Sequence, residues 1–233
     1  MSAYGRVCAL VLAGGVGSRM GGEVTKQKIN ILGRSVLYYS VAAFDACPDI
    51  DDIVVVARED EIEFALSELK AMGKVRSVVS GGSCRAESAR LGFLALPDDA
   101  EFVAIHDAAR PLITPESISA VVKEAARLGA ASAVSCVTDT VKVVDAEGII
   151  LSTLDRGVLR RAETPQVFST KLYKEALDAA GSFIGITDDN MLLEHIGVGV
   201  GTVDVGRENI KITVSEDLKY AELLLKERGW RDV

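Results

Sequence analysis

The sequence predicts an α/β fold: one Rossmann-like body with a doubly wound, mostly parallel sheet, from which a β-hairpin arm projects. Short apolar runs bounded by turn residues alternate with segments of helical spacing, which is the pattern of βαβ units. The 233 residues, 48% of them hydrophobic and 26% charged, are enough for one continuous core. Between residues 138 and 161 the alternation gives way to two short β-type runs joined by a turn.

The expected strands are continuous apolar runs, as in parallel strands whose two faces are both buried. They cover Val7–Leu12, Ile53–Ala57, Val75–Val79, Phe102–Ile105 and Ala131–Val137. The helices expected between them have apolar residues three or four positions apart, and Thr114-Pro115-Glu116 gives the fourth helix a cap and a first turn. These helices cover Val36–Ala46, Glu61–Met72, Ala86–Leu96 and Ser117–Leu128.

The arm is expected from the runs Thr140–Val144 and Ile149–Leu154, which flank a turn-rich tetrapeptide. A projecting hairpin cannot bury both of its faces alone, so we expect the arm, residues 138–161, to pack against a second copy in a homodimer. The chain then returns to the body through further helices and strands. We expect helices at Lys171–Ala180, Asp189–Ile196 and Glu216–Arg228, and strands at Gly201–Val205 and Ile210–Val214.

Charge and composition exclude several classes of protein. With 26 basic and 34 acidic side chains the net charge is −8, so no nucleic-acid partner is expected. No apolar run approaches the roughly 20 residues that span a bilayer, and the first residues lack a signal-peptide pattern, which predicts a cytoplasmic protein without a membrane partner. Four separated cysteines without a C-x-x-C pair and only two histidines argue against a structural zinc site and exclude a three-histidine metal site.

A glycine-rich loop follows the first strand, with five glycines between Gly14 and Gly22. Glycines at the carboxyl end of a strand let backbone N–H groups surround phosphate oxygens. The loop fits neither the dinucleotide fingerprint, because Met20 takes the place of the third glycine, nor the Walker pattern. Arg19, Lys26 and Lys28 lie close by and could stabilise a transferring phosphoryl group. A purely structural turn and ordinary solvated lysines are the alternatives.

A second polar cluster follows the fourth strand, in the sequence Ile105-His106-Asp107-Ala108-Ala109-Arg110-Pro111. The Asp107 carboxylate is placed to hold Mg²⁺ beside a polyphosphate, either directly or through water. An interaction of Asp107 with Arg110 within the turn is the alternative. His106 is expected to be a hydrogen-bonded structural residue rather than an acid or base.

Taken together, these and further motifs resemble the 2-C-methyl-D-erythritol 4-phosphate cytidylyltransferases of the non-mevalonate isoprenoid pathway. The ordered set spans nearly the whole chain and comprises Ala13 to Met20, Lys26-Gln27, Gly81 to Ser88, His106 to Pro111, Asp139-Thr140, Asp155-Arg156, Thr164-Pro165-Gln166, Thr187-Asp188 and Asn209 to Thr213. Two positions depart from the family pattern. Thr25 stands where proline usually precedes the lysine, and Ser83 stands where an acidic residue is common.

The resemblance implies one nucleotidyltransferase domain over residues 1–233 and assigns roles to individual residues. It implies that Arg19, Lys26, Lys211 and Arg156 are catalytic and that Asp107 is the residue near Mg²⁺. The implied CTP-binding residues are Ala13, Gly14, Gly15, Gly17, Gly82, Arg85 and Ser88. The implied acceptor-binding residues are Asp107, Arg110, Thr140, Arg156, Thr164 and Lys211, some of them reaching across the dimer from the arm.

The implied reaction transfers CMP from CTP to 2-C-methyl-D-erythritol 4-phosphate and releases pyrophosphate. A phosphate monoester, with a second pKa of about 6, is largely dianionic at pH 7 and therefore attacks without a general base. This suits a site that is rich in cations and poor in histidine. The alternatives are a cytidylyltransferase for ribitol 5-phosphate and a non-catalytic module that binds CTP.

Overall fold

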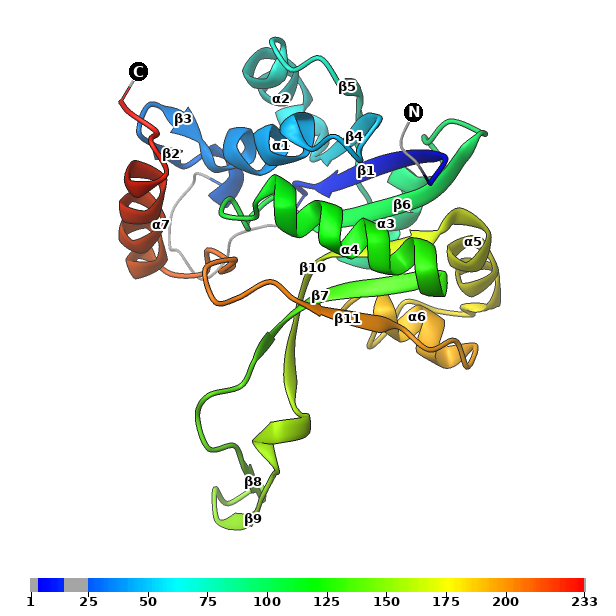
Figure 1. The fold of residues 1–233 in the computed structure, drawn as a ribbon, viewed down its shortest axis with the longest axis vertical. Coiled ribbons are helices and arrows are strands. Elements are labelled where there is room, and N and C mark those ends of the chain that lie inside the picture. Colours follow the sequence, from blue (N-terminus) through cyan, green and yellow to red (C-terminus); the bar gives the residue numbers. More distant parts are fainter. Residues whose placement is uncertain (1–3, 15–24, 233) are drawn as a thin grey trace.

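The computed structural model describes residues 4–14 and 25–232. Within these residues, seven strands form one sheet in the order β11-β7-β10-β6-β1-β4-β5 (Figure 1). Neighbouring strands are parallel except where β10 pairs antiparallel with β6 and with β7. The strands are β1 (Arg6–Leu12), β4 (Asp52–Ala57), β5 (Val75–Ser80), β6 (Ala100–Asp107), β7 (Ala130–Cys136), β10 (Arg160–Ser169) and β11 (Gly201–Asp204).

Helices cover both faces of the sheet, as a doubly wound fold requires. Alternate residues of β1 enter different cores: Val7, Ala9 and Val11 pack with α1, α2 and α4, whereas Leu10 and Leu12 pack with α3, α5 and α6. In Figure 1, α1 and α4 lie in front of the sheet and α3 lies behind it. These helices are α1 (Val36–Ala46), α2 (Ile62–Leu69), α3 (Arg85–Phe93), α4 (Pro115–Leu128), α5 (Thr170–Ala179) and α6 (Asn190–His195).

The predicted ends of α4 are confirmed by its capping contacts. The Thr114 hydroxyl accepts a hydrogen bond from the Ser117 amide at 3.2 Å, and Pro115 is the first helical residue. The helix stops at Gly129, whose φ of 89° is a left-handed conformation that glycine adopts without strain. The remaining helices and strands expected before residue 138 are present, with boundaries that differ by a few residues.

Strand β10 was not expected from the sequence. Its first half carries Arg160, Arg161 and Glu163, and Pro165 lies in its middle after a cis peptide bond, so the segment has neither an apolar run nor a regular alternation. The register against β7 shifts between Ala162 and Gln166, where the proline interrupts the ladder. This strand brings Thr164 beside the end of β6, which places it in the site described below.

The strand expected at Ile210–Val214 is absent from the described structure. Residues 209–214 form an irregular segment, which we call the strap, that leads into α7 (Ser215–Glu227). The alternating side chains that suggested a strand instead pack Ile210 and Ile212 into a third core under α7. This core also includes Ile31 of the short strand β2 (Asn30–Ile31), which pairs antiparallel with β3 (Arg34–Ser35); neither strand was expected.

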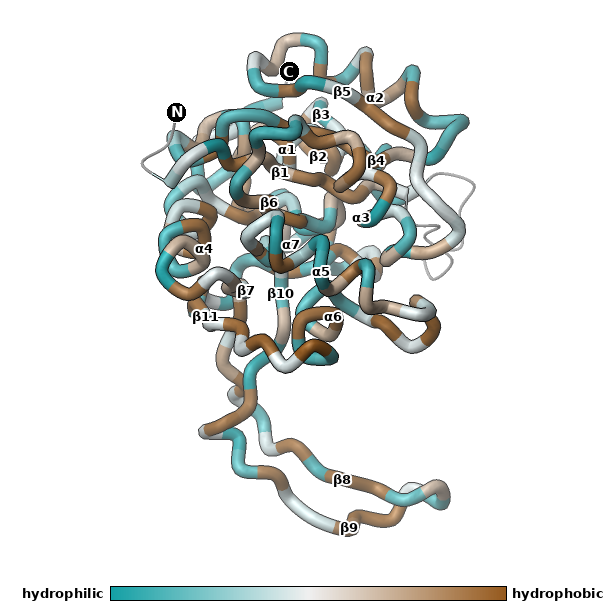
Figure 2. Tube along the Cα trace, turned by 90° about the vertical axis from the view of Figure 1, so that its right-hand side faces the viewer, coloured by the Kyte–Doolittle hydropathy of each residue, from teal (hydrophilic) through white to brown (hydrophobic). Residues whose placement is uncertain are grey.

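The predicted arm is confirmed as a hairpin that projects away from the body (Figure 1). Strands β8 (Lys142–Val144) and β9 (Ile150–Thr153) pair antiparallel and are exposed throughout. Figure 2 shows hydrophobic stretches along both strands. The exposed large apolar side chains of the arm are Val143 and Val144 in β8, Ile150 and Leu151 in β9, and Ile149, Leu154 and Val158 beside the strands. Among the described residues, no helix is both long enough and apolar enough to cross a membrane.

Candidate active site

The candidate site lies at the carboxyl ends of the central parallel strands, where ligands bind in open α/β sheets. A cavity of 520 Å³ opens there, between the ends of β1, β4 and β5. Its lining residues are Gly14, Ala57, Arg58, Glu59, Asp60, Ser80, Gly81 and Gly82. Gly14 and Gly82, two of the residues predicted to bind CTP, therefore line one cavity, and their contact with CTP stays a prediction.

The turn before α3 is held closely against that helix. Ser88 Oγ accepts a hydrogen bond from the Gly82 amide at 3.0 Å and donates one to the Cys84 carbonyl at 2.9 Å. A Cβ atom at Gly81 would lie 2.9 Å from Ser88 Oγ, and one at Gly82 would collide with Glu87, so this turn has no room for side chains. Ser88, one of the predicted CTP-binding residues, therefore already fixes the shape of this turn.

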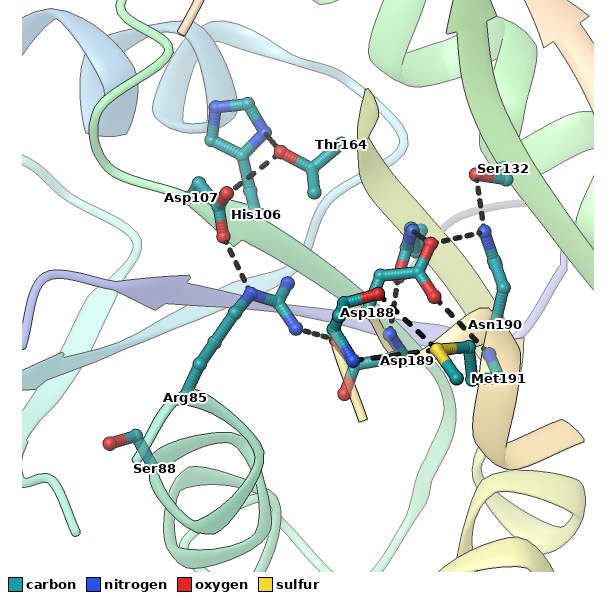
Figure 3. A network of polar contacts seen from close by, with 12 residues as sticks. Arg85, Ser88, His106, Asp107, Ser132, Thr164, Asp188, Asp189, Asn190 and Met191 are labelled. Atoms are coloured by element: carbon teal, nitrogen blue, oxygen red, sulfur yellow. Dashed lines mark hydrogen bonds and ion pairs between the residues drawn. The ribbon is translucent and has the colours of Figure 1, made fainter. Parts of the chain in front are cut away.

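Asp107, at the end of β6, is the centre of a charged cluster (Figure 3). Its Oδ1 accepts a hydrogen bond from Arg85 Nε at 3.0 Å, and its Oδ2 accepts one from Lys211 Nζ at 2.6 Å. Burial alone would raise the pKa of Asp107, but the charges of Arg85 and Lys211 outweigh it and hold this pKa well below its ordinary range. The carboxylate is therefore ionised at neutral pH. The backbone amide of Asp107 donates a hydrogen bond to Thr164 Oγ1 at 3.1 Å.

Arg85 also binds a residue that the sequence analysis did not single out. Its Nη1 donates to Asp189 Oδ2 at 2.6 Å, and the Asp189 side chain is fully buried. The other oxygen of Asp189 accepts from the Tyr173 hydroxyl at 2.7 Å, while its amide donates to Gln166 Oε1 at 2.9 Å. The signal available in the sequence was the Thr187-Asp188 pair of the family motifs, which Asp189 follows directly. Asp189 fixes Arg85, which in turn contacts Asp107.

His106 is a structural residue, as predicted. Its Nδ1 lies 3.0 Å from Thr164 Oγ1, and its Nε2 lies 3.1 Å from the Arg110 carbonyl oxygen. Burial lowers the pKa of His106 to about 4, so the ring is neutral at pH 7. A histidine with both nitrogens occupied and no exposed surface is not available as a general base.

The two predicted catalytic lysines approach the site from distant parts of the chain. Lys26 Nζ donates to the carbonyl oxygens of Ile212 and Thr213 in the strap, at 3.2 and 3.3 Å. Lys211, within the strap, binds Asp107 as described above. Gln27 Nε2 donates to the Ala13 carbonyl at 2.6 Å, which joins the Lys26 segment to the end of β1. The strap therefore brings both lysines to the same edge of the sheet.

Arg110 lies beneath the strap rather than in the open cavity. Its side chain is 11% exposed; its Nη1 donates to the Asn209 carbonyl at 2.7 Å and lies 3.6 Å from Glu163 Oε2. Asn209 Nδ2 donates to the same carboxylate oxygen at 3.0 Å and to the Thr164 carbonyl at 2.9 Å. Arg110 thus fixes the start of the strap, and its predicted contact with acceptor phosphate stays a prediction.

Two further predicted residues, both on the arm, are not brought into this cluster. Thr140 and Arg156 are exposed on the arm, and Arg156 Nη1 donates to the Thr138 carbonyl at 2.6 Å. Gly15, Gly17 and Arg19 lie outside the described residues. Ser83, which stands where the family commonly has an acidic residue, forms hydrogen bonds nearby: its amide and its hydroxyl both donate to Glu87 Oε2. Thr25, which stands where the family usually has proline, also has a hydrogen-bond partner, since its hydroxyl donates to Glu61.

The chain matches one family over most of its length. The model of the 2-C-methyl-D-erythritol 4-phosphate cytidylyltransferase (IspD) family matches residues 7–227. The 2-C-methyl-D-erythritol 4-phosphate cytidylyltransferase of Endomicrobium trichonymphae is 41% identical over 218 residues, which cover 94% of this chain and 98% of that protein. The enzyme of the same name from Desulforamulus reducens is 42% identical over 230 residues, with coverages of 97% and 98%.

The fold matches as well. The crystal structure of the 4-diphosphocytidyl-2C-methyl-D-erythritol synthase from Anaerococcus prevotii superposes with a TM-score of 0.84 at 28% sequence identity, covering 96% of this chain and 97% of that one. The sequence relatives and this structure agree with the resemblance seen in the sequence motifs. The chain belongs to the 2-C-methyl-D-erythritol 4-phosphate cytidylyltransferase family.

Proposed function

We propose that this chain transfers CMP from CTP to 2-C-methyl-D-erythritol 4-phosphate, giving 4-diphosphocytidyl-2-C-methyl-D-erythritol and pyrophosphate in isoprenoid precursor biosynthesis. The observation that carries the proposal is a group of cations next to a cavity of 520 Å³ bordered by glycines: Arg85 and Lys211 bind Asp107, and Lys26 binds the strap that carries Lys211. The identity of the two substrates is inferred from the family, and the cations of this site are the groups that phosphate chemistry needs.

In the proposed mechanism, an oxygen of the acceptor's dianionic 4-phosphate attacks the α-phosphorus of CTP in line with the leaving group. A new P–O bond forms to the α-phosphorus as its bond to the bridging oxygen of the pyrophosphate breaks. Lys26 stabilises the negative charge that develops on the pentacoordinate α-phosphate, together with Arg19. Lys211 orients the acceptor phosphate. No proton is removed from the nucleophile, so no general base is needed, and the neutral, enclosed His106 supports this view.

The cavity is proposed to hold CTP through backbone groups more than through side chains. Gly14 and Gly82 line it, and the glycine-rich stretch that includes Ala13, Gly15 and Gly17 is proposed to surround the triphosphate. Arg85 and Ser88 are half-buried and buried respectively, and both have protein partners, so we assign them to fixing the shape of the nucleotide pocket.

Mg²⁺ is the proposed cofactor, and the residues present fit an ion that is carried mainly by substrate phosphates. Asp107 is ionised, but each of its oxygens already accepts from a cation, and no three acidic, histidine or cysteine side chains cluster elsewhere among the described residues. Mg²⁺ usually keeps several waters and uses one or two carboxylates. Asp107 would therefore hold it through water. When bound, the ion neutralises charge on the pyrophosphate leaving group.

A homodimer formed through the arm is part of the proposal. The exposed apolar side chains of β8 and β9 have no partner among the described residues, and a hairpin of this length is marginal by itself. In a dimer, the Thr140 and Arg156 side chains would reach the acceptor site of the partner subunit, which accounts for their distance from the cluster in one chain. Arg156 would then bind the acceptor's phosphate.

We also propose a cytoplasmic location. All four cysteines are free, and Cys84 and Cys136 are exposed. Exposed free thiols persist in reducing compartments, which supports the cytoplasm.

The test is pyrophosphate release from CTP and Mg²⁺, measured in parallel with 2-C-methyl-D-erythritol 4-phosphate and with ribitol 5-phosphate as acceptors. Turnover with the first acceptor alone is the expected result. Turnover with ribitol 5-phosphate alone would overturn the acceptor assignment. CTP binding without release of pyrophosphate with either acceptor would identify a non-catalytic module.

A further inference from the structure

The strap is held at its end by a carboxylate outside the charged cluster. We propose that Asp217, in the first turn of α7, is a positioning residue for Lys26 and acts through Thr213. The inference rests on the role of Lys26 in the proposed transfer. Asp217 is separated from Lys26 by 190 intervening positions in the sequence, yet the strap, which leads into α7 (Figure 1), forms hydrogen bonds with both.

Three hydrogen bonds converge on one oxygen of Asp217. Its Oδ2 accepts from the Thr213 amide at 2.6 Å, from the Thr213 hydroxyl at 2.9 Å and from the Val214 amide at 3.0 Å. The bond to Val214 caps the start of α7, because the Asp217 carboxylate, in the first turn of the helix, accepts from the amide of the cap residue. The two bonds to Thr213 go beyond capping, because Thr213 precedes the cap residue and belongs to the strap.

The strap residues fixed in this way are the ones that hold Lys26. The carbonyl oxygens of Ile212 and Thr213 accept from Lys26 Nζ, and the Ile212 amide donates to the Ala109 carbonyl at 2.8 Å. Ala109 follows β6, so the strap is tied to the sheet on one side and to Asp217 on the other. Because a peptide carbonyl turns with its chain, loosening Thr213 moves two acceptors of the Lys26 ammonium.

The charge of Asp217 supports the same positioning role as its hydrogen bonds. Burial opposes ionisation of Asp217, but its bonds to Val214 and Thr213 and the nearby charge of Lys26 lower its pKa below the ordinary value. The carboxylate lies at a helix N-terminus, where negative charge is favourable. Asp217 therefore provides a fixed negative charge near Lys26.

Two substitutions separate positioning from charge. Asp217→Ala removes all three hydrogen bonds, and we expect kcat to fall about 10- to 100-fold, less than for loss of a direct electrostatic stabiliser. The KM for the acceptor should change less than about threefold, because Lys26 acts on the α-phosphate. Asp217→Asn keeps an oxygen acceptor in place and should recover kcat to within about threefold of wild type. Thr114→Ala, which uncaps α4, is the control for helix loss and should leave kcat unchanged.

A double-mutant cycle tests whether Asp217 acts through Lys26. In a Lys26→Ala background, Asp217→Ala should change the residual kcat by less than about twofold, because the group it positions is gone. Three results would overturn the proposal: a kcat of Asp217→Ala within twofold of wild type, an Asp217→Asn variant as slow as Asp217→Ala, or an undiminished effect in the Lys26→Ala background.

A second measurement does not depend on turnover. Competitive acetylation of Lys26, followed by peptide mass spectrometry, should be faster in Asp217→Ala than in wild type and unchanged in Asp217→Asn and Thr114→Ala. If wild type releases no pyrophosphate but acetylation behaves as expected, the proposed function fails while the positioning role stands. Equal acetylation in wild type and Asp217→Ala would contradict the positioning role whatever the activity.

Discussion

The buried contact between Tyr173 and Asp189 allows a sharp stability prediction. Tyr173→Phe removes only the hydroxyl that donates to Asp189 Oδ1 at 2.7 Å. The ring keeps its stacked contact with Phe168 and its edge contact with Phe93, so no cavity opens. Burial and the Asp189 charge hold the pKa of Tyr173 well above its ordinary value, so the hydroxyl carries its proton at every pH used.

The size of the effect follows from the charge of the acceptor. A hydrogen bond to a charged group contributes about 1.5–3 kcal/mol, whereas a bond between neutral groups contributes about 0.5–1.5 kcal/mol. Tyr39 is the matched control, because its buried hydroxyl donates to the Ile31 carbonyl at the same distance of 2.7 Å. We expect Tyr173→Phe to lower the free energy of unfolding by about 2 kcal/mol and Tyr39→Phe by about 1 kcal/mol.

Urea denaturation and thermal unfolding at one fixed protein concentration measure both values. For a chain of this size, a loss of 1 kcal/mol lowers Tm by about 2–4 °C, so Tyr173→Phe should melt about 4–8 °C below wild type. Turnover at 25 °C should change less than about threefold, because Asp189 still binds Arg85 and Gln166. A Tyr173→Phe protein as stable as Tyr39→Phe would refute the view that Asp189 is a buried charge supported by this hydroxyl.

Four further predictions follow from the site and the arm. Lys26→Ala should lower kcat about 10²- to 10³-fold in the pyrophosphate-release assay, and an unchanged kcat would remove Lys26 from the mechanism. Arg156→Ala should raise the KM for the acceptor and lower kcat/KM while the KM for CTP stays constant; unchanged acceptor kinetics would contradict its assignment. Ile150→Glu should convert a dimer into a monomer in light scattering, and a persistent dimer would place the interface elsewhere. Because the folded pKa of His106, about 4, lies below its ordinary value of 6.5, its contribution to stability is present above pH 6.5 and is lost as the pH falls toward 4. Urea denaturation from pH 7 to 4 should therefore show a loss of stability that is about 3 kcal/mol larger in wild type than in His106→Asn, and equal losses in both would contradict a buried neutral ring.

The sequence allowed prediction of the elements whose signal is local. Strand β1 is an unbroken apolar run, and α4 carries Thr114, Pro115 and Gly129 at the positions where a helix begins and ends. Asp107 was found because it ends a buried strand, and ligand sites in this class of fold lie at such ends. Each of these signals is contained in about ten residues.

Features that depend on distant partners could not be predicted in this way. Strand β10 contains Pro165 and Glu163, and it is stable because β6 and β7 flank it and because Ser135, Asn209 and Arg161 bind the Glu163 carboxylate. The strap was expected to be a strand, but its isoleucines pack against α7, and among the described residues no strand pairs with it. In the sequence, Asp189 is indistinguishable from a solvated acidic residue of a loop. Its role follows only from the hydrogen bond that it accepts from Arg85 of α3. In each case the deciding contact joins residues far apart in the chain.

The central claim is that the acceptor's own phosphate oxygen attacks the α-phosphorus of CTP. The most direct test is the reaction of CTP and Mg²⁺ with 2-C-methyl-D-erythritol 4-phosphate whose phosphate oxygens carry ¹⁸O, followed by ³¹P NMR and mass spectrometry. We expect all of the label to remain in 4-diphosphocytidyl-2-C-methyl-D-erythritol, including the oxygen that bridges its two phosphorus atoms. The released pyrophosphate should carry no label. Label in the pyrophosphate, or no labelled nucleotide product, would contradict it.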